Sequence, residues 1–227
     1  FFRYNFSRHY ALRANFSGGT LYGDDAISED AFRKNRNLSF TSSIIEASLL
    51  MEFNFLPYEI GSKKYFFTPY VMGGFGLFSY NPEATYLDPA TGESVTVPLQ
   101  SLGTEGQGTT LYPGKEPYSL VQTTLPFGVG VKLNIWEFSI GAEFGARKTF
   151  TDYLDDVSGT YADKSIVQSQ NGPAAAILSD RSLNQDAKPG SLRGNPDDND
   201  WYMFTGINHS FRLDRKNDGS KSFYFKR

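Results

Sequence analysis

The stretch VQTTLPFGVGVKLNI, residues 121–135, decides the fold of this chain. Its odd positions are almost all apolar, whereas its even positions carry Gln, Thr, Pro, Gly, Lys and Asn. The next segment, 136–147, repeats the alternation with its apolar residues at even positions. Strands usually have about five or six residues, and a strand that crosses a bilayer needs roughly nine to eleven. Alternation of this length, with an apolar face opposite a face that bears charge, predicts an outer-membrane β-barrel.

Five further segments alternate in the same way. They lie at 1–6, 9–22, 38–56, 64–80 and 201–213, so that we expect seven strands. The connections between the strands alternate in length. Short links lie at 7–8, 57–63 and near 134–136, and long polar loops lie at about 23–36, 81–117 and 150–200. Bacterial outer-membrane barrels have short periplasmic turns and long extracellular loops, which is the pattern found here.

The parity of the strands leads to a further expectation. Seven strands begin on the long-loop side and end on the short-turn side, whereas bacterial barrels of this kind have an even number of strands. We therefore expect one more strand and a signal peptide before Phe1, giving a small antiparallel barrel of eight strands in the intact protein. Residues 1–213 would form the transmembrane barrel with its loops, and 214–227 a periplasmic C-terminal tail.

Composition excludes several other classes of protein. The 227 residues carry a net charge of −3 and form no basic stripe, so no nucleic-acid partner is expected. Cysteine is absent, which excludes disulfide bonds and thiolate metal sites. No run approaches the roughly 18 apolar residues that indicate a transmembrane helix. Aromatic residues reach 16%, which suits the interfacial girdles of a barrel, although a β-sandwich rich in Phe and Tyr would show the same content.

The inward positions of the predicted strands carry charges of both signs. An eight-stranded barrel has an interior just wide enough for side chains to fill it. An unpaired charge there would cost several kcal/mol, so the charges should form one ion-pair network. Its expected members are Arg3, Arg13, Glu46, Glu52, Lys132, Glu137, Glu143, Arg147 and Arg212. Glu143 and Arg147, four residues apart on one strand, should share partners. A filled interior does not conduct solutes, which argues against a porin.

Residues with reactive or metal-binding side chains are few. His9 lies at a turn and His209 near the end of the last strand, and neither has a convincing nucleophile and carboxylate for a triad. Residues 149–163 hold several aspartates, whose oxygens suit calcium, but their spacing fits no EF-hand and acidic loops are usually solvated. We assign no catalytic, cofactor-binding or metal site.

The C-terminal tail combines aromatic and basic residues. Phe223, Tyr224, Phe225, Lys226 and Arg227 close the chain. One interpretation is a solvated terminus. The other is a docking segment in the periplasm, in which the aromatic rings supply burial and the basic groups supply steering.

Several motifs resemble one family of small barrels. They are RNLSFTSS (36–43), EFNFLPY (52–58), FSYNPEA (78–84), YSLVQTTLPFGVGVK (118–132), EFGARKTFTDYLDDVSGTY (143–161) and DWYMFTGINHSFRL (200–213). In these motifs the chain resembles the PorG family, outer-membrane barrels of the type IX secretion system of Bacteroidetes. The long motif at 143–161 is the most specific of them, and the resemblance extends from about Phe1 to Leu213.

The resemblance implies a non-enzymatic structural component of a protein-export machine. It would anchor the periplasmic ring of the PorK lipoprotein and PorN to the outer membrane, with lipid and these ring proteins as partners and no small-molecule substrate. The alternative is a passive surface-anchoring or adhesion barrel that acts through the loops 81–117 and 150–200. A third possibility, a lipid-modifying enzyme of the outer membrane, would need a nucleophile and base that the sequence lacks.

Overall fold

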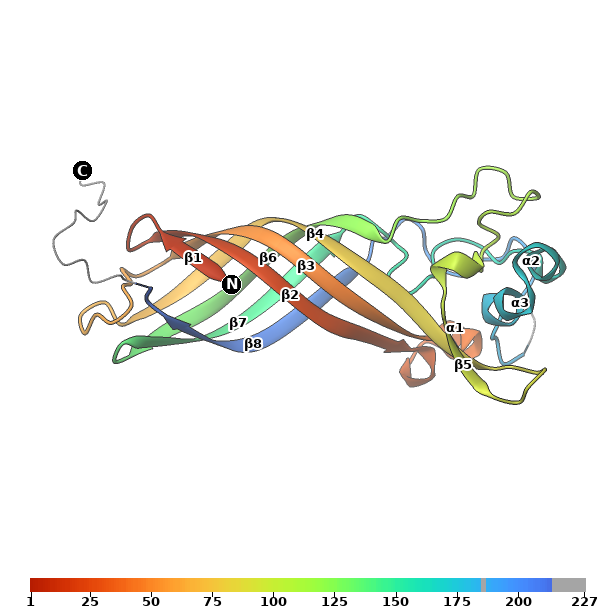
Figure 1. Ribbon diagram of the computed structural model, residues 1–227, viewed down its shortest axis with the longest axis horizontal. Helices are drawn as coiled ribbons and strands as arrows, with labels where there is room; N and C mark the ends of the chain where they lie inside the picture. The colour runs from red at the N-terminus through yellow and green to blue at the C-terminus, as the bar shows by residue number, and fades with distance from the viewer. Residues whose placement is uncertain (185–186, 214–227) are drawn as a thin grey trace.

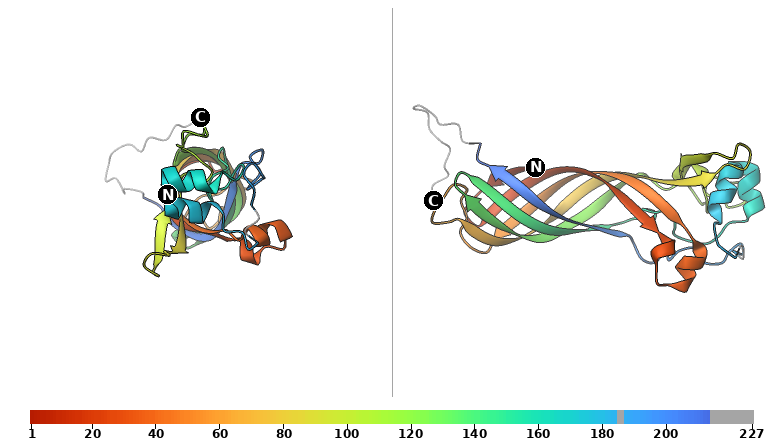
Figure 2. Two further views of the ribbon diagram at one scale, coloured as in Figure 1. Left: turned by 90° about the vertical axis from the view of Figure 1, so that its right-hand side faces the viewer. Right: turned by 90° about the horizontal axis from the view of Figure 1, so that it is seen from below.

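The main body of the protein is a curled antiparallel sheet (Figure 1). The computed structural model describes residues 1–184 and 187–213. Seven strands follow one another in the order β1-β2-β3-β4-β6-β7-β8. They are β1 Phe2–Asn5, β2 Tyr10–Asp24, β3 Ser39–Asn54, β4 Phe67–Leu87, β6 Val121–Ile135, β7 Phe138–Thr149 and β8 Trp201–Phe211. Viewed along its length, the sheet curves around on itself as a half-barrel (Figure 2). The predicted all-β antiparallel fold is confirmed.

Burial alternates along the long strands. In β3, Ile45 and Leu49 on the convex face are each 52% exposed, whereas Glu46 and Glu52 on the concave face are 2% and 0% exposed. In β6 the exposed positions are the odd ones, apart from the half-buried Leu125. The convex face is therefore apolar and exposed, and the concave face, called the interior below, holds the charged groups.

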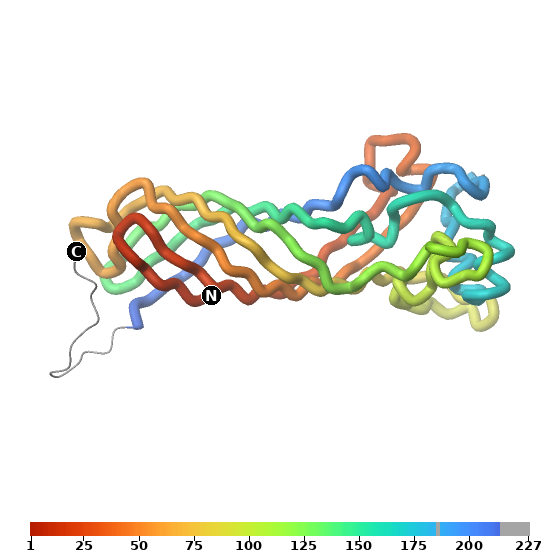
Figure 3. Tube along the Cα trace, turned by 90° about the horizontal axis from the view of Figure 1, so that it is seen from above, coloured from red at the N-terminus to blue at the C-terminus, as the bar shows by residue number. Residues whose placement is uncertain are grey.

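Secondary structure also fills the long connections, which the sequence had indicated only as loops. Strand β4 continues to Leu87 and pairs there with β5, Ser94–Pro98. The long connections also contain five short helices among the described residues: η1 Asp25–Ile27, α1 Ala31–Arg36, η2 Gln100–Leu102, α2 Lys164–Asn171 and α3 Pro173–Ser179. These elements gather at one end of the sheet (Figure 3). We call the segments 88–120 and 150–200, with β5 and the helices in them, the loop-end cap. No helix in the described segments is long and apolar enough to cross a membrane.

The opposite end of the sheet carries only short connections. They are 6–9, 55–66 and 136–137, and the C-terminal end of β8 lies beside them (Figure 1). The predicted link at 134–136 is wrong by one to two residues, because β6 continues through Ile135 and Trp136 begins the turn. The predicted segregation of short and long connections to opposite ends agrees with the structure.

The sheet has an open seam between β2 and β8. Strand β1 pairs only with Ala11–Ala14, so that β2 from Asn15 to Asp24 has β3 as its one strand partner among the described residues. In the same described residues, β8 pairs only with β7. A cavity of about 430 Å³ lies at this seam, lined by β2 and by the residues Tyr202, Met203 and Phe204 of β8.

Candidate functional site

Glu52 lies at the centre of an ion-pair cluster in the interior. Its carboxylate is fully buried and lies 2.8 Å from Arg3 Nε, 2.5 Å from Lys132 Nζ and 3.5 Å from Arg13 Nη1. These partners come from β1, β6 and β2, so one carboxylate connects strands on opposite sides of the interior. Lys132 also donates to Asn54 Oδ1 at 3.0 Å. Because each charge has a partner of opposite sign, the cost of burying it is offset.

Two further carboxylates hold buried cations in the interior. Glu143 accepts hydrogen bonds from both terminal nitrogens of Arg13, at 2.7 and 3.0 Å, and from the hydroxyl of Tyr70 at 2.7 Å. Such a bidentate pair is among the stronger hydrogen-bonded arrangements in proteins. Glu46 accepts from Arg147 Nε and from Tyr202, each at 2.7 Å. The network thus joins β2 to β7 and β3 to both β7 and β8 across the interior.

The structure buries seven of the nine predicted residues in the interior, but in two separate groups among the described residues. Arg3, Arg13, Glu52, Lys132 and Glu143 form one group, and Glu46 with Arg147 forms the other. The remaining two predicted residues lie outside the interior. Glu137 lies in the two-residue turn between β6 and β7 and is exposed. The prediction placed it on a strand, but the left-handed backbone of Trp136 (φ 57°) turns the chain there and ends the alternation. Arg212 follows the last residue of β8, is 44% exposed and pairs with Glu59 at 3.7 Å.

The expected sharing of partners by Glu143 and Arg147 is also wrong. Arg13 pairs with Glu143, and Glu46 pairs with Arg147. Successive inward residues on a tilted strand reach different heights of the interior, so each meets a different strand across it.

A second polar cluster lies in the loop-end cap. Glu105 is 1% exposed and accepts from the backbone nitrogens of Ser158 and Gly159, each at about 3 Å, and from Arg193 at 3.2 Å. Asp156, also 1% exposed, accepts from Thr104 and from Tyr118 at 2.5 and 2.8 Å. The cluster fixes Thr104, Glu105 and Tyr118 against residues 156–159 and Arg193, so distant parts of the cap pack together.

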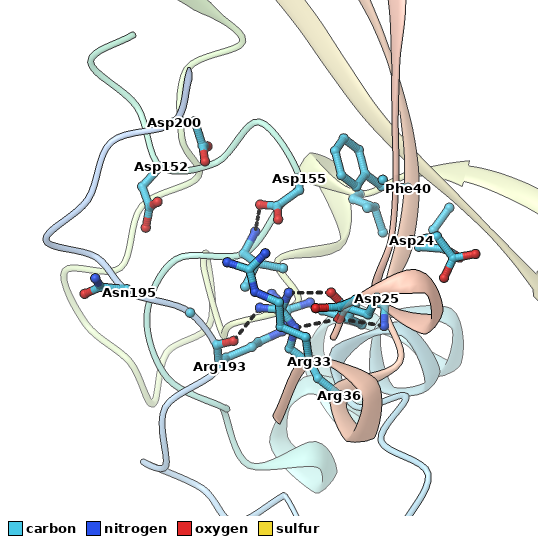
Figure 4. Close-up of a pocket in the computed structure, with 18 of the residues that line it drawn as sticks. Asp24, Asp25, Arg33, Arg36, Phe40, Asp152, Asp155, Arg193, Asn195 and Asp200 are labelled. Atoms are coloured by element: carbon cyan, nitrogen blue, oxygen red, sulfur yellow. Dashed lines mark hydrogen bonds and ion pairs between the residues drawn. The ribbon is translucent and has the colours of Figure 1, made fainter. Parts of the chain in front are cut away.

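A polar pocket of about 570 Å³ lies where the cap meets the ends of β2 and β3. Figure 4 shows Asp152, Asp155 and Asp200 on one side of it and Asp25 with Arg36 on the other. The Asp25 and Arg36 side chains form a bidentate pair, at 2.7 and 2.8 Å. Nothing in the sequence indicated this pocket, because its walls come from loops without a periodic pattern.

The pKa values of the pocket carboxyls are raised. Burial raises the pKa of Asp152 and of Asp155 to about 7, and neighbouring carboxylates add to the effect at both. Burial also raises the pKa of Asp200 to about 6, with the Asp152 carboxylate contributing. The pocket wall therefore gains negative charge as the pH rises through neutrality.

The acidic residues of 149–163 have structural contacts. Asp163 caps α2 by accepting from Ser165 N at 2.9 Å, and Asp155 accepts from Val157 N at 3.1 Å. Among the described residues no group of three or more His, Cys, Asp or Glu side chains is arranged to hold a metal ion. The calcium hypothesis for this loop therefore has no support in the described residues.

Both histidines lie on the short-turn half of the sheet. His9 Nδ1 is 2.8 Å from Asn54 O, and the His209 ring lies 5.1 Å from the ring of Phe138. The predicted docking residues Phe223, Tyr224, Phe225, Lys226 and Arg227 lie outside the described residues.

Comparison with known proteins gives one match. A family model described as a domain of unknown function (DUF6089) matches residues 1–97, which span β1 to β4 and most of β5. No curated protein and no solved structure matches the chain.

Proposed function

We propose that this protein is an outer-membrane β-barrel. The observation that carries the proposal is the convex face, where large apolar side chains are exposed on every strand from β1 to β8 except the short β5. They include Phe2, Phe16, Ile45, Leu49, Phe75, Leu77, Val129, Phe144, Met203 and Ile207. Soluble proteins rarely expose contiguous apolar patches larger than a few hundred Å², whereas lipid covers such a surface. The long strands have 11 to 21 residues, enough to cross a bilayer.

The open seam supports an intact barrel of eight strands. Strands β1 and β8 both run from the loop end toward the short-turn end. One added strand in the opposite direction would therefore be antiparallel to both of its neighbours, β1 and β8, and barrel closure would pair the edges of these two strands that lack partners in the described residues. An edge left unpaired in lipid would cost several kcal/mol for each backbone group.

The distribution of connections supports an orientation in the membrane. The short connections 6–9, 55–66 and 136–137 would lie in the periplasm, and the loop-end cap outside the cell. Because the chain has no cysteine, single cysteines can test this. A cysteine at Leu111, which is 60% exposed, should react with an impermeant label on intact cells, and one at Lys63 should not. The opposite labelling pattern would reverse the orientation.

Within this architecture we propose a structural, non-enzymatic role in type IX secretion. The sequence resemblance to the PorG family favours it. The interior favours a holding role over transport, because paired charged side chains and the buried rings of Tyr70 and Phe78 occupy it. The protein would anchor a periplasmic ring of PorK-like and PorN-like proteins to the outer membrane.

Recovery of the ring proteins tests this function. A tagged chain purified from outer membranes should carry PorK-like and PorN-like proteins with it, and its deletion should reduce secretion. The alternative, an adhesion barrel, is favoured by the ordered cap and its pocket. If ring proteins are absent from the purified material and loss of 150–200 abolishes surface attachment, the adhesion function replaces the secretion function.

A further inference from the structure

The short-turn rim is a set of contacting segments from distant parts of the chain. It consists of the connections 6–9, 55–66 and 136–137, together with Arg212 at the end of β8 (Figure 1). Tyr58 N donates to Arg8 O at 3.0 Å, and Arg8 Nε lies 3.1 Å from Glu59 Oε2. Arg212 lies 3.7 Å from the other carboxylate oxygen of Glu59. One acidic side chain therefore joins three of the rim's segments.

The longest of these connections is fixed to the end of the sheet. Asn134 Nδ2 donates to Glu59 O at 2.7 Å and to Ser62 O at 3.3 Å, and Tyr58 donates to Asn134 Oδ1 at 2.5 Å. The Arg8 guanidinium lies 4.3 Å from the centre of the Tyr65 ring. A surface held in this way loses little conformational freedom on binding a partner, which favours affinity.

Trp136 is the unusual residue of the rim. It is 86% exposed, more than any other large apolar side chain in the described residues, and its backbone is left-handed at φ 57°. Positive φ is a genuine outlier for a bulky residue, whereas glycine adopts it without strain. The indole contributes almost no burial to the chain's own fold. Strained backbone of this kind persists chiefly at functional positions. We therefore take a contact made by the indole as the reason for a tryptophan at this position.

The charges of the rim point to the chemistry of that contact. In the described part of the rim the basic side chains are Arg8, Lys63, Lys64 and Arg212, and the acidic ones are Glu59 and Glu137. Glu59 is already paired with both arginines, so Lys63 and Lys64 leave an excess of positive charge. Exposed Trp, Tyr and Arg side chains are enriched among the residues that dominate binding energy at protein interfaces.

We propose that the short-turn rim docks a protein partner that receives Trp136 in an apolar pocket bordered by acidic groups. The inference rests on the proposed function, and its partner is the periplasmic ring. Trp136 is the buried anchor, and the two lysines steer the approach of the acidic surface. An exposed tryptophan would also suit the lipid headgroup layer. The lipid test below separates a protein partner from lipid.

The binding test uses the purified full chain in lipid nanodiscs and a purified ring of PorK-like and PorN-like proteins. Trp136→Gly removes the indole and relieves the left-handed strain, so the chain should unfold at the same or a higher denaturant concentration. Its affinity for the ring should fall at least about tenfold. Trp201→Phe is the matched control, since Trp201 is the chain's other tryptophan and begins β8 at the opposite end. It should bind the ring as the unsubstituted chain does.

The charge test uses Lys63→Glu together with Lys64→Glu. Both side chains are exposed, so the fold should be unaffected, and association with the ring should slow and lose its salt dependence. This variant decides the question if Trp136→Gly does not fold. Binding that is unchanged in both variants overturns the docking surface and leaves the proposed function intact. If the unsubstituted chain itself does not bind the ring, both fail.

The lipid test uses Trp201→Phe, in which Trp136 is the only tryptophan, in vesicles without the ring. Trp136 should fluoresce as a water-exposed indole, quenched by aqueous acrylamide and not by brominated lipid chains. Emission typical of an apolar environment, quenched by the brominated lipid, would make Trp136 a lipid anchor and overturn the proposal.

Discussion

Replacing Arg147 with methionine should destabilise the folded chain by about 3–5 kcal/mol, because the change leaves a buried carboxylate without its cation. Arg147 and Glu46 have side chains that are 3% and 2% exposed, and Arg147 is the one salt-bridge partner of Glu46 among the described residues. After the substitution, Glu46 keeps only the hydroxyls of Tyr202 and Ser48, each at 2.7 Å. Two neutral hydrogen bonds do not replace the attraction of a guanidinium at 2.7 Å.

The double variant Arg147→Met with Glu46→Gln should be more stable than either single variant. It removes both charges, and the amide oxygen of the glutamine can still accept from Tyr202. Replacing a whole buried pair by neutral groups is often nearly neutral in free energy. An exposed pair provides the control: Arg8 and Glu59 are 53% and 36% exposed, so the charge interaction lost in Arg8→Met should cost no more than about 1 kcal/mol.

Equilibrium unfolding in denaturant, with the chain in lipid vesicles, measures the free energy of unfolding of the unsubstituted chain, the two single variants and the double variant. We expect a coupling free energy of at least about 2 kcal/mol between the two positions. Additive effects, or an Arg147→Met variant as stable as the unsubstituted chain, would refute the conclusion that the interior is a network of buried ion pairs.

Three other changes test the membrane-facing surface and the cap. Phe144→Arg, on the convex face of β7, should cost about 2–4 kcal/mol in vesicles if the position lies at the bilayer midplane; an unchanged unfolding midpoint would contradict membrane embedding. Burial raises the folded-state pKa of Asp155 to about 7 from its usual value of 3.8. The folded cap therefore binds more protons than the unfolded chain between these values, and its stability should fall as the pH rises through that range. Amide exchange in 150–200 should therefore be faster at high pH, after correction for intrinsic rates, and Asp155→Asn should reduce this dependence; a dependence unchanged by the substitution would exclude the carboxyl. Glu105→Gln should loosen the cap through its contact with Arg193, and protease cleavage of 150–200 that is no faster than in the unsubstituted chain would contradict that role.

The sequence predicted the sheet because one physical constraint acts on every long strand. Each strand alternates between an apolar outer face and an interior face, and the period of two is preserved from Ile44 to Asn54 and from Val121 to Ile135. The prediction went wrong where this constraint ends. Glu137 continues the alternation in the sequence, but the hairpin turns at Trp136, and alternation alone does not locate a turn without Gly or Asn.

The cap was not predictable in the same way. The β4–β5 hairpin pairs Glu83–Leu87 with Ser94–Pro98, and the alternation in β5 spans only five residues, far fewer than in the strands of the main sheet. The packing of the cap depends on single polar contacts such as Glu105 with Arg193, which are 88 residues apart. No periodicity marks such a pair, because its members meet only after both loops have folded.

The interior network also explains how the sheet keeps its curvature with an open seam. No hydrogen bonds join β1 to β8 in the described residues, so backbone pairing does not set the distance between the two edges. Two contacts cross the interior beside the seam instead. Arg13 of β2 pairs with Glu143 of β7, and Glu46 of β3 accepts from Tyr202 of β8. Each holds one side of the seam relative to the other through a charged hydrogen bond of 2.7 Å. The gap therefore has a defined width, and in the barrel we propose, the added strand would enter a preformed site.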